Sequence, residues 1–393
     1  MKRPSILVAH PWMGRGGSEA TAMWTVEALQ DDYDLTFVTA SRVDWAELNR
    51  VYGTAVDPLK FQTLKAPVLP GVNGPNRLVY LQQRYFGRYC RKIASSFDLC
   101  LSVYNPIDFG RSAIHLIGDF SFSEEMRRRL NSHATESFQH RSGLLRRLYL
   151  GLGDWIGGRR PPLSQWGGLI LANSAWSARQ LEDHFGVFGA EVIFPPVTLP
   201  VSPAGSGHRD PMGFVCLGRV VPEKEIERIV RILRRVRDSG YPVSLHLIGD
   251  LQDSDYGREL ARMIEPDRDW IIPTGFLALE AKWEILSSRT YAIHACRIEA
   301  FGIAVAEMAS MGCLPFVPST GGAGEIVPLP ELQYGDDDEA VVKILTMLEN
   351  PRRVKELAEE LPCLMERFGP PNFKVQLSRH VIDFAERVRV SGK

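Results

Sequence analysis

Residues 297–307, RIEAFGIAVAE, place two glutamates, Glu299 and Glu307, on either side of a short apolar run. Between residues 300 and 324, Glu307 is the only charged residue. A segment of this composition is expected to be buried, and a buried carboxylate is unfavourable unless it is paired or hydrogen-bonded. The two carboxylates are therefore the first candidates for chemistry in this chain.

The residues between the two glutamates predict the start of a helix. A strand over TYAIHA (290–295) is expected to end before Glu299, and a helix to begin at Phe301, Gly302 and Ile303. The first backbone N–H groups of a helix lack partners and favour an anion, and a glycine lets a ligand approach closely. A nucleotide phosphate fits this place.

Glu307 would lie on about the second turn of this helix, on the same face as Ile303. There its carboxylate could accept hydrogen bonds from the vicinal hydroxyls of a ribose, while Glu299 could meet the sugar or the acceptor. In a purely structural interpretation, Glu299 caps the helix and Glu307 pairs with a buried arginine. The two glutamates, the helix-start glycine and TGGAGE (320–325) occur together, which favours a site.

The pattern ExFGxxxxE followed by GCLPFVPSTGGAGEIV resembles the glutamate-x7-glutamate signature of retaining glycosyltransferases of family 4. Further stretches resemble this family in the same order along the chain: GRGGSE (14–19), ANSAWSARQLEDHFG (172–186) and GRVVPEKEIERIV (218–230). The resemblance implies the GT-B fold, in which two Rossmann-like, doubly wound domains face a cleft. It also implies transfer of a sugar from a nucleotide diphosphate with retention of the anomeric configuration.

A loop with two cationic residues supports the same function on chemical grounds, independently of the resemblance. Arg219 follows the predicted strand GFVCLG, and Lys224 lies five residues on, near the start of the next helix. Two cations there would stabilise the diphosphate charge that develops as the glycosidic bond breaks, without a metal. The alternative is a solvated pair, although a lysine in a first helical turn is electrostatically unfavourable. Where the family often has Lys-Gly, this chain has Lys224-Glu225.

A glycine-rich turn follows the first predicted strand. Gly14, Gly16 and Gly17 permit a tight turn and the close approach of a diphosphate to a helix start, and we assign Gly16 and Gly17 to the donor. The spacing lacks the GxGxxG pattern with an acidic residue about 20 positions on, which disfavours a nicotinamide dehydrogenase. An ordinary strand-to-helix turn is the alternative.

Two further assignments come from the resemblance alone. It places His115, in SAIHLIGDFSF (112–122), beside the donor sugar as a catalytic residue with Glu299, and Asp119 is a second candidate nearby. It places Phe276, in the TGF turn, against the nucleotide base. The alternatives are a core histidine and an ordinary hydrophobic turn residue.

The expected reaction moves a hexose from GDP-mannose or a UDP-hexose to a hydroxyl of a glycan, glycolipid or polysaccharide intermediate. A nucleotide-sugar epimerase of the same fold and a non-catalytic sugar-nucleotide binding protein remain alternatives. No metal or other cofactor is expected, because the acidic stretches DSD (253–255) and DDD (336–338) lie in polar surface-like surroundings.

Composition sets broader limits. The formal net charge of −1 gives no overall field that would attract nucleic acid. The six scattered cysteines form no CxxC pair and suggest reduced thiols in the cytoplasm. The N-terminus lacks the apolar length of a signal peptide, so we expect a cytoplasmic protein with possible peripheral contact at the inner face of a membrane.

Residues 124–160 contain eight arginines against four acidic residues, with Phe138, Tyr149 and Trp155 interleaved. This segment could contact anionic lipid head groups or a lipid-phosphate acceptor. The favoured alternative is a solvated face or an acceptor-side loop, because runs of charged residues are usually exposed to solvent.

Short apolar runs alternate with amphipathic stretches along the whole chain, which predicts an α/β protein with parallel sheets covered on both faces. In EKEIERIVRILRRVRD (223–238), the apolar residues recur at helical spacing. The Pro-, Gly- and Ser-rich stretch 198–211 predicts a linker. We expect an acceptor-binding domain over 1–200, a nucleotide-sugar-binding domain over 208–370 and a final helix, 371–393, that returns to the first domain.

Overall fold

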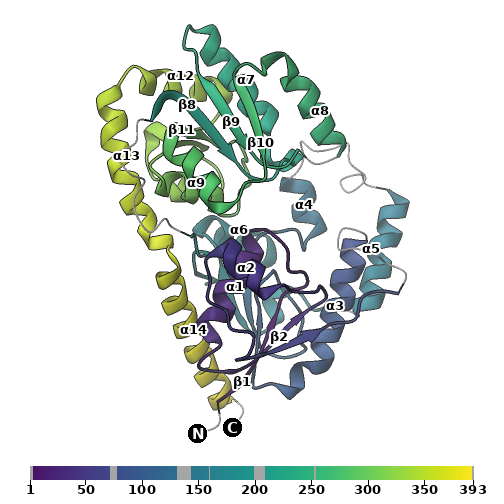
Figure 1. Ribbon diagram of the computed structural model, residues 1–393. Coiled ribbons are helices and arrows are strands. Elements are labelled where there is room, and N and C mark those ends of the chain that lie inside the picture. Colours follow the sequence, from purple (N-terminus) through teal and green to yellow (C-terminus); the bar gives the residue numbers. More distant parts are fainter. Residues whose placement is uncertain are drawn as a thin grey trace. The chain divides into compact units, whose positions relative to one another are not determined.

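The computed structural model describes residues 3–70, 78–130, 143–158, 160–198, 209–251 and 254–391. The chain divides into two compact units, shown in Figure 1. Unit 1 contains residues 1–196 and 370–393, and unit 2 contains residues 197–369. Each unit is built around its own parallel β-sheet. The last helix therefore belongs to the first unit, although the chain reaches it only after completing the second.

The sheet of unit 1 has the strand order β3-β2-β1-β4-β5-β6-β7, and all its pairings are parallel. Its strands are β1 (Ser5–Ala9), β2 (Asp34–Thr39), β3 (Gln62–Lys65), β4 (Leu99–Ser102), β5 (Ile114–Ile117), β6 (Leu169–Ala172) and β7 (Glu191–Val192). Its helices are α1 (Gly17–Leu29), α2 (Trp45–Tyr52), α3 (Val79–Ile93), α4 (Glu124–Leu130), α5 (Leu144–Gly157), α6 (Ala175–Phe185) and α14 (Pro370–Ser391), with short 3-10 turns at Ala94–Ser96 and Leu163–Gln165.

Alternation along β1 explains how both faces of this sheet are covered. Ile6 and Val8 point to a core formed with α1, α2 and α14, whereas Leu7 and Ala9 point to a core formed with α3. Because side chains of a strand alternate between faces, an apolar run with no polar position requires helices on both sides. Helix α14 contributes Phe373 to the first of these cores, which fixes the chain's return to unit 1.

The sheet of unit 2 has the order β10-β9-β8-β11-β12-β13, again with parallel pairings. Its strands are β8 (Asp210–Leu217), β9 (Ser244–Ile248), β10 (Ile271–Gly275), β11 (Arg289–Ile293), β12 (Leu314–Pro318) and β13 (Gln333–Tyr334). Its helices are α7 (Ile226–Asp238), α8 (Asp255–Ile264), α9 (Leu279–Ser288), α10 (Ile303–Ser310), α11 (Ala323–Ile326), α12 (Asp337–Leu348) and α13 (Pro351–Met365), with 3-10 turns at Pro222–Lys224, Glu265–Asp267, Pro330–Leu332 and Glu366–Phe368.

The position of β8 and β11 matters most for function. These two strands lie side by side at the centre of the sheet, where the strand order reverses. In open α/β sheets, ligands bind beyond the carboxyl ends of strands at such a reversal. The loops that follow β8 and β11 carry Lys224 and Glu299, respectively.

Among the described residues, no helix is both long enough and apolar enough to cross a lipid bilayer.

Candidate functional site

Lys224 and Glu299 form a direct ion pair in unit 2. Lys224 ends the 3-10 turn after β8, and its Nζ contacts Oε2 of Glu299 in the loop after β11. Nε2 of His294, the residue directly after β11, lies 3.2 Å from the same carboxylate oxygen, outside the angular range of a regular hydrogen bond. The structure thus brings together the cation and the first glutamate, which are 75 positions apart in the sequence.

The charges of this pair reinforce each other. Burial alone would raise the pKa of Glu299, but Lys224 and His294 outweigh it and hold that pKa far below its usual value. Burial would lower the pKa of Lys224, yet the carboxylate of Glu299 keeps it above the ordinary value. Arg219 opposes this rise, which places its charge near Lys224. At neutral pH the pair is therefore fully ionised and presents a fixed ammonium group beside two strand ends.

Glu225, which stands where the resemblance often has a glycine, adopts a left-handed backbone conformation with φ 49° and ψ 44°. A glycine tolerates this conformation, whereas a residue with a Cβ is strained by roughly 1–2 kcal/mol. The carboxylate of Glu225 accepts two hydrogen bonds from Arg297, at 3.0 Å from Nε and 2.9 Å from Nη2. A bidentate ion pair between the Lys224 loop and the Glu299 loop therefore offsets the strain and fixes the residue next to Lys224.

Two substitutions at position 225 separate these contributions. Glu225→Gly removes the strain together with the ion pair, and we expect its unfolding free energy to stay within about 1 kcal/mol of wild type. Glu225→Ala keeps the strain but loses the pair, and we expect destabilisation by about 1–2 kcal/mol. Thermal and urea denaturation of the two variants measure this difference. Equal stability of the two variants would show that the left-handed backbone at position 225 is not strained, and equal stability of wild type and Glu225→Ala would show that the pair with Arg297 contributes nothing.

The two adjacent glycines of the TGGAGE segment hold the Glu299 loop by close backbone contact. The N–H of Gly322 donates to the carbonyl oxygen of Glu299 at 2.7 Å. A Cβ on Gly321 would lie 3.0 Å from the same oxygen, and a Cβ on Gly322 would lie 2.2 Å from the carbonyl oxygen of Ala300. Larger residues cannot fit there, so these glycines serve packing around the loop.

The start of α10 is formed as the sequence predicts, but not by every residue in the expected role. Gly302 precedes the first helical residue, Ile303, and has φ 107°, a conformation that favours glycine. The Phe301 side chain is buried and meets Phe368 edge to face, with ring centroids 5.2 Å apart. Any contact of Phe301 with a donor must therefore use its backbone.

Glu307 lies on α10 and pairs with a lysine. Its Oε1 accepts a hydrogen bond from Nζ of Lys282, on α9, at 2.9 Å. The alternative without a functional site predicted a buried arginine as the partner of Glu307. The structure shows that the partner is Lys282. Pairing with Lys282 orients one carboxylate oxygen, and the other remains a candidate for sugar hydroxyls.

Arg219 and Phe276 are the exposed members of the predicted donor site. The structure records no side-chain ion pair between Arg219 and another described residue. Phe276 follows β10 and has 59% of its surface exposed. A planar base could stack on a phenylalanine that is exposed after the carboxyl end of a strand.

In unit 1, Gly16 and Gly17 form the start of α1 as expected. The N–H of Gly16 donates to the hydroxyl oxygen of Tyr52 at 2.8 Å, and this hydroxyl lies 3.1 Å from the carbonyl oxygens of Gly14 and Gly16. A Cβ on Gly16 would lie 2.7 Å from Oε2 of Glu19. The helix start is thus held by a tyrosine that no local sequence pattern indicates, and it already faces a carboxylate from its own first turn.

The structure buries His115, which the resemblance placed beside the donor sugar. His115 lies within β5, two residues before the strand ends at Ile117. Its side chain is 1% exposed and lies between Phe109 and Trp166, at centroid distances of 6.0 and 5.3 Å. Burial lowers the pKa of His115 to about 3, so the ring is neutral. His115 is a core histidine, which was the structural alternative.

Asp119, the second candidate, lies beyond the carboxyl end of β5. Its Oδ1 accepts hydrogen bonds from Nδ2 of Asn105 at 2.6 Å and from the backbone N–H and hydroxyl of Ser121 at 2.9 and 2.6 Å. Asn105 follows β4, adopts a left-handed conformation with φ 59°, and also accepts from the N–H of Gly118. This network fixes a carboxylate at the carboxyl ends of two neighbouring strands of unit 1.

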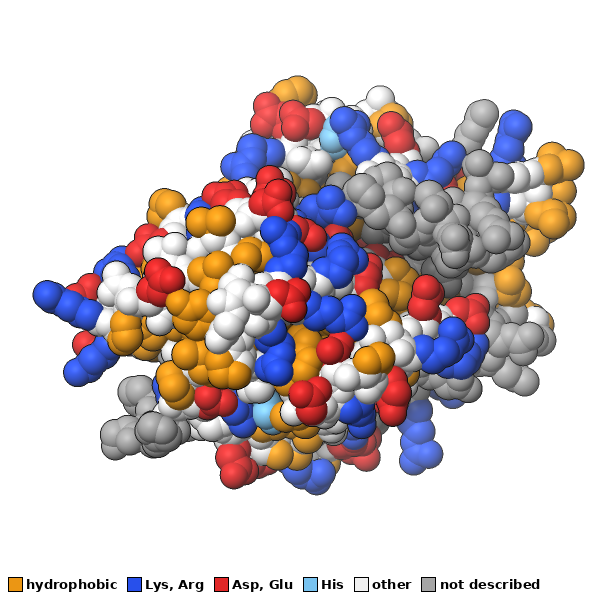
Figure 2. Space-filling model, turned by 90° about the horizontal axis from the view of Figure 1, so that it is seen from above, with side chains coloured by type: hydrophobic (Ala, Val, Ile, Leu, Met, Phe, Trp, Pro, Cys, Tyr) orange, Lys and Arg blue, Asp and Glu red, His pale blue; other side chains and the backbone are white. Residues whose placement is uncertain are grey.

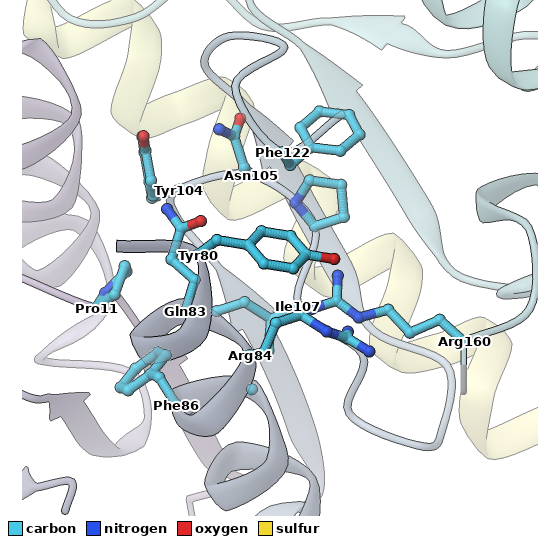
Figure 3. A pocket seen from close by; sticks show the side chains of 12 residues that line it. Pro11, Tyr80, Gln83, Arg84, Phe86, Tyr104, Asn105, Ile107, Phe122 and Arg160 are labelled. Carbon is cyan, nitrogen blue, oxygen red and sulfur yellow. The ribbon is translucent and has the colours of Figure 1, made fainter. Parts of the chain in front are cut away.

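A pocket lies next to this network. Its cavity volume is about 40 Å³, and it is partly open to solvent. Figure 3 shows Tyr80, Gln83, Arg84 and Phe86 of α3 along the lower part of this pocket and Asn105 and Phe122 above them. Arg160 reaches toward α3, where its Nη2 would lie 4.0 Å from a Cβ on Gly87. Aromatic rings combined with an arginine suit a polar ring-shaped or anionic ligand.

Comparisons with known proteins agree with this arrangement of two parallel sheets. Residues 205–361 match the model of the family described as glycosyl transferases group 1. Anabaena Alr3699/HepE, solved in complex with UDP-glucose, superimposes with a TM-score of 0.67 at 16% identity, covering 97% of this chain and 100% of that chain. Sucrose-phosphate synthase from Thermosynechococcus elongatus gives a TM-score of 0.71 at 15% identity, covering 97% and 99%. The chain has the GT-B fold.

The lipopolysaccharide glycosyltransferase WaaG is a third structural neighbour, with a TM-score of 0.64 at 12% identity over 92% of this chain and 95% of that chain. The sequence has no significant match among the curated proteins. The family match covers residues 205–361, which is less than half of the chain, and the structural neighbours show the fold. The matched segment contains Lys224, Glu299 and Glu307, whereas Gly16 and His115 lie outside it.

Proposed function

We propose that this chain is a retaining, metal-independent glycosyltransferase of family 4 that transfers a hexose from a nucleotide-diphosphate donor. The proposal depends on one observation above all: Lys224 and Glu299 form an ionised pair beyond β8 and β11, within the segment that matches group 1 glycosyl transferases. An ammonium group held at a strand-order reversal suits a diphosphate leaving group.

The proposed roles follow from the chemistry of each group. Lys224, with Arg219, stabilises the negative charge of the departing diphosphate, whose oxygens also face the N–H groups at the start of α10. Glu307 binds the ribose hydroxyls through the oxygen that Lys282 does not occupy. Glu299 faces the donor sugar. Glu225 and Arg297 keep the two loops together and act as positioning residues.

The proposed reaction proceeds on one face of the sugar. The bond between the anomeric carbon and the diphosphate oxygen breaks, and the acceptor oxygen bonds to the same face of that carbon. The proton of the acceptor hydroxyl passes to the departing phosphate oxygen. This route assigns no side chain as a covalent nucleophile.

We propose that no metal takes part. Within the described residues, one group of potential ligands brings three donor atoms within 4.8 Å of one another: His294, Cys296 and Glu299. Cys296 is buried, and Lys224 already pairs with the Glu299 carboxylate. A divalent ion would have to displace this ammonium. The DDD stretch has structural roles, since Asp336 caps α12 and Asp337 and Asp338 pair with Arg228 and Arg235.

GDP-mannose or a UDP-hexose is the proposed donor, and the hydroxyl of a glycan, glycolipid or polysaccharide intermediate the proposed acceptor. The UDP-glucose complex of Alr3699/HepE supports a nucleotide-sugar partner. The pocket of unit 1 is our candidate acceptor site. We place the protein in the cytoplasm, at the inner face of a membrane.

A two-stage experiment tests this function. Thermal shift with UDP, GDP, ADP and TDP sugars should identify one donor that raises the melting temperature, because a ligand at 100 times its Kd stabilises the native state by about 2.7 kcal/mol. With that donor, an acceptor panel should release the nucleotide diphosphate and give product of unchanged anomeric configuration, in EDTA as well.

Other outcomes would identify other functions. Isomerisation of the donor sugar without an acceptor would indicate an epimerase. Donor binding without release of nucleotide across the whole panel would indicate a binding protein. The absence of any stabilising nucleotide sugar would refute the donor site.

A further inference from the structure

Helix α5, residues Leu144–Gly157, has its apolar side chains on the outside. Leu144, Leu145, Leu148, Leu152 and Trp155 are 71%, 73%, 61%, 47% and 79% exposed. These five residues, here called the α5 stripe, make up a third of the fifteen large hydrophobic side chains that are exposed in the described part of the chain. Positions 144, 148, 152 and 155 fall on one helical face. Soluble proteins rarely leave such a stripe without a partner.

The inward face of α5 is polar and firmly fixed. Arg146 is buried and pairs with Glu124 of α4, with Nη2 2.6 Å from Oε2. Gly153 packs so closely on α3 that a Cβ there would lie 2.4 Å from Cε1 of Tyr80. The hydroxyl of Tyr80 donates to Asp154 at 2.7 Å. The helix therefore cannot turn its leucines inward without breaking these contacts, and their exposure is a property of the fold.

Positive charge lies beside the stripe. Helices α4 and α5 together carry five arginines against three acidic residues, and Arg146 is already paired with Glu124. Arg128, Arg129 and Arg147 are exposed. Figure 2 shows orange hydrophobic and blue basic side chains together at the right-hand edge, on the side where Figure 1 draws α5.

We propose that the α5 stripe inserts into the head-group region of an anionic lipid bilayer. A helix with leucines and a tryptophan on one face and arginines beside them is the pattern of helices that lie in the membrane interface, and the arginines select anionic lipids. This inference adds a specific surface to the proposed membrane location, and it does not depend on the donor or on the reaction.

Two other occupants fit less well. A second copy docked on the same stripe would bring its own Arg147 and Arg128 against those of the first copy, and like charges oppose this. The chain between α4 and α5, residues 131–142, contains a single large apolar residue, Phe138, which is too little to cover five exposed side chains.

Sedimentation of the full-length protein with lipid vesicles tests the inference. We expect wild type to bind vesicles of equal parts phosphatidylcholine and phosphatidylglycerol, to bind pure phosphatidylcholine far less, and to lose binding in high salt. Leu148→Glu/Leu152→Glu should weaken binding to the anionic vesicles by about tenfold or more. Both positions are exposed, so this variant should keep the melting temperature of wild type. Leu59→Glu, at a position of unit 1 that is 93% exposed but far from α5 in sequence, is the matched control and should bind as wild type does.

Three results would overturn the inference. Wild type could fail to bind anionic vesicles, or the double variant could bind them as well as Leu59→Glu does. Alternatively, wild type could be a dimer that the double variant converts to a monomer, which would make the stripe a contact between copies. Donor binding, measured by thermal shift on the same samples, should be unchanged in all variants, so failure here leaves the proposed reaction untouched.

Discussion

Replacing Lys224 by methionine should lower the rate of sugar transfer by about 10²–10³-fold, the typical effect of removing one charge-stabilising donor from an active site. The ammonium group counters the charge that appears on the diphosphate as the glycosidic bond breaks, so the loss should be in kcat more than in KM. Steady-state kinetics with the donor identified by thermal shift measure this. A variant with wild-type kcat would refute the assigned role.

The same substitution also changes stability, which calls for a control. Removing Lys224 leaves the Glu299 carboxylate mostly buried, at 17% side-chain exposure, with His294 as its remaining neighbour. We expect destabilisation by about 1–3 kcal/mol, at the lower end of values for broken buried pairs because both groups retain some solvent contact. In the double variant Lys224→Met/Glu299→Gln, stability should return toward wild type while transfer stays low. If the double variant regained both the stability and the transfer rate of wild type, the ion pair would contribute to stability alone.

The effect on stability should depend on pH in a defined direction. The pKa of Glu299 is lower in the folded protein than in the unfolded chain, so its ion pair stabilises the fold above the ordinary carboxyl range. That contribution is lost as the pH falls through the lowered pKa. The difference in melting temperature between wild type and Lys224→Met should therefore be largest near neutral pH and shrink below about pH 4.

Local sequence patterns predicted the strands well where the strands are buried on both faces. The run SILVA (5–9) coincides with β1, because a strand covered on both sides must be apolar at every position. By contrast, β3, QTLK, was not predicted. It is an edge strand with mostly exposed side chains, so neither composition nor alternation distinguishes it from a loop.

The local structure of the candidate site was predictable where one segment contains the whole pattern, as in α10 with its preceding glycine. It was not predictable where it depends on distant partners. His115 was assigned by resemblance alone, and its burial between Phe109 and Trp166 comes from tertiary structure. The Arg297 partner of Glu225, 72 positions away, and the Tyr52 hydroxyl under the Gly14–Gly16 turn come from tertiary structure alone.

Glu307→Ala should weaken donor binding by about 10- to 100-fold, the loss expected when charge-assisted hydrogen bonds worth about 1.5–3 kcal/mol are removed. The effect should be in KM with kcat little changed, since ribose contacts are similar in the ground and transition states. Lys282→Met is the matched control, because it removes the other half of the same ion pair and should disturb local stability to a similar extent.

A donor that lacks the ribose 2′-hydroxyl separates a ligand-binding carboxylate from a structural one. If Glu307 binds the vicinal hydroxyls, wild type and Lys282→Met should both prefer the ribonucleotide donor to its 2′-deoxy analogue, by about tenfold for one lost hydrogen bond. Glu307→Ala should accept the two almost equally, because the group that senses the hydroxyl is gone. If Glu307 serves only to hold α9 against α10 through Lys282, the two variants will melt at the same lowered temperature and both will keep the preference of wild type. Discrimination between the two donors, more than affinity for either, therefore decides whether the solitary charge in this apolar segment is there for the substrate.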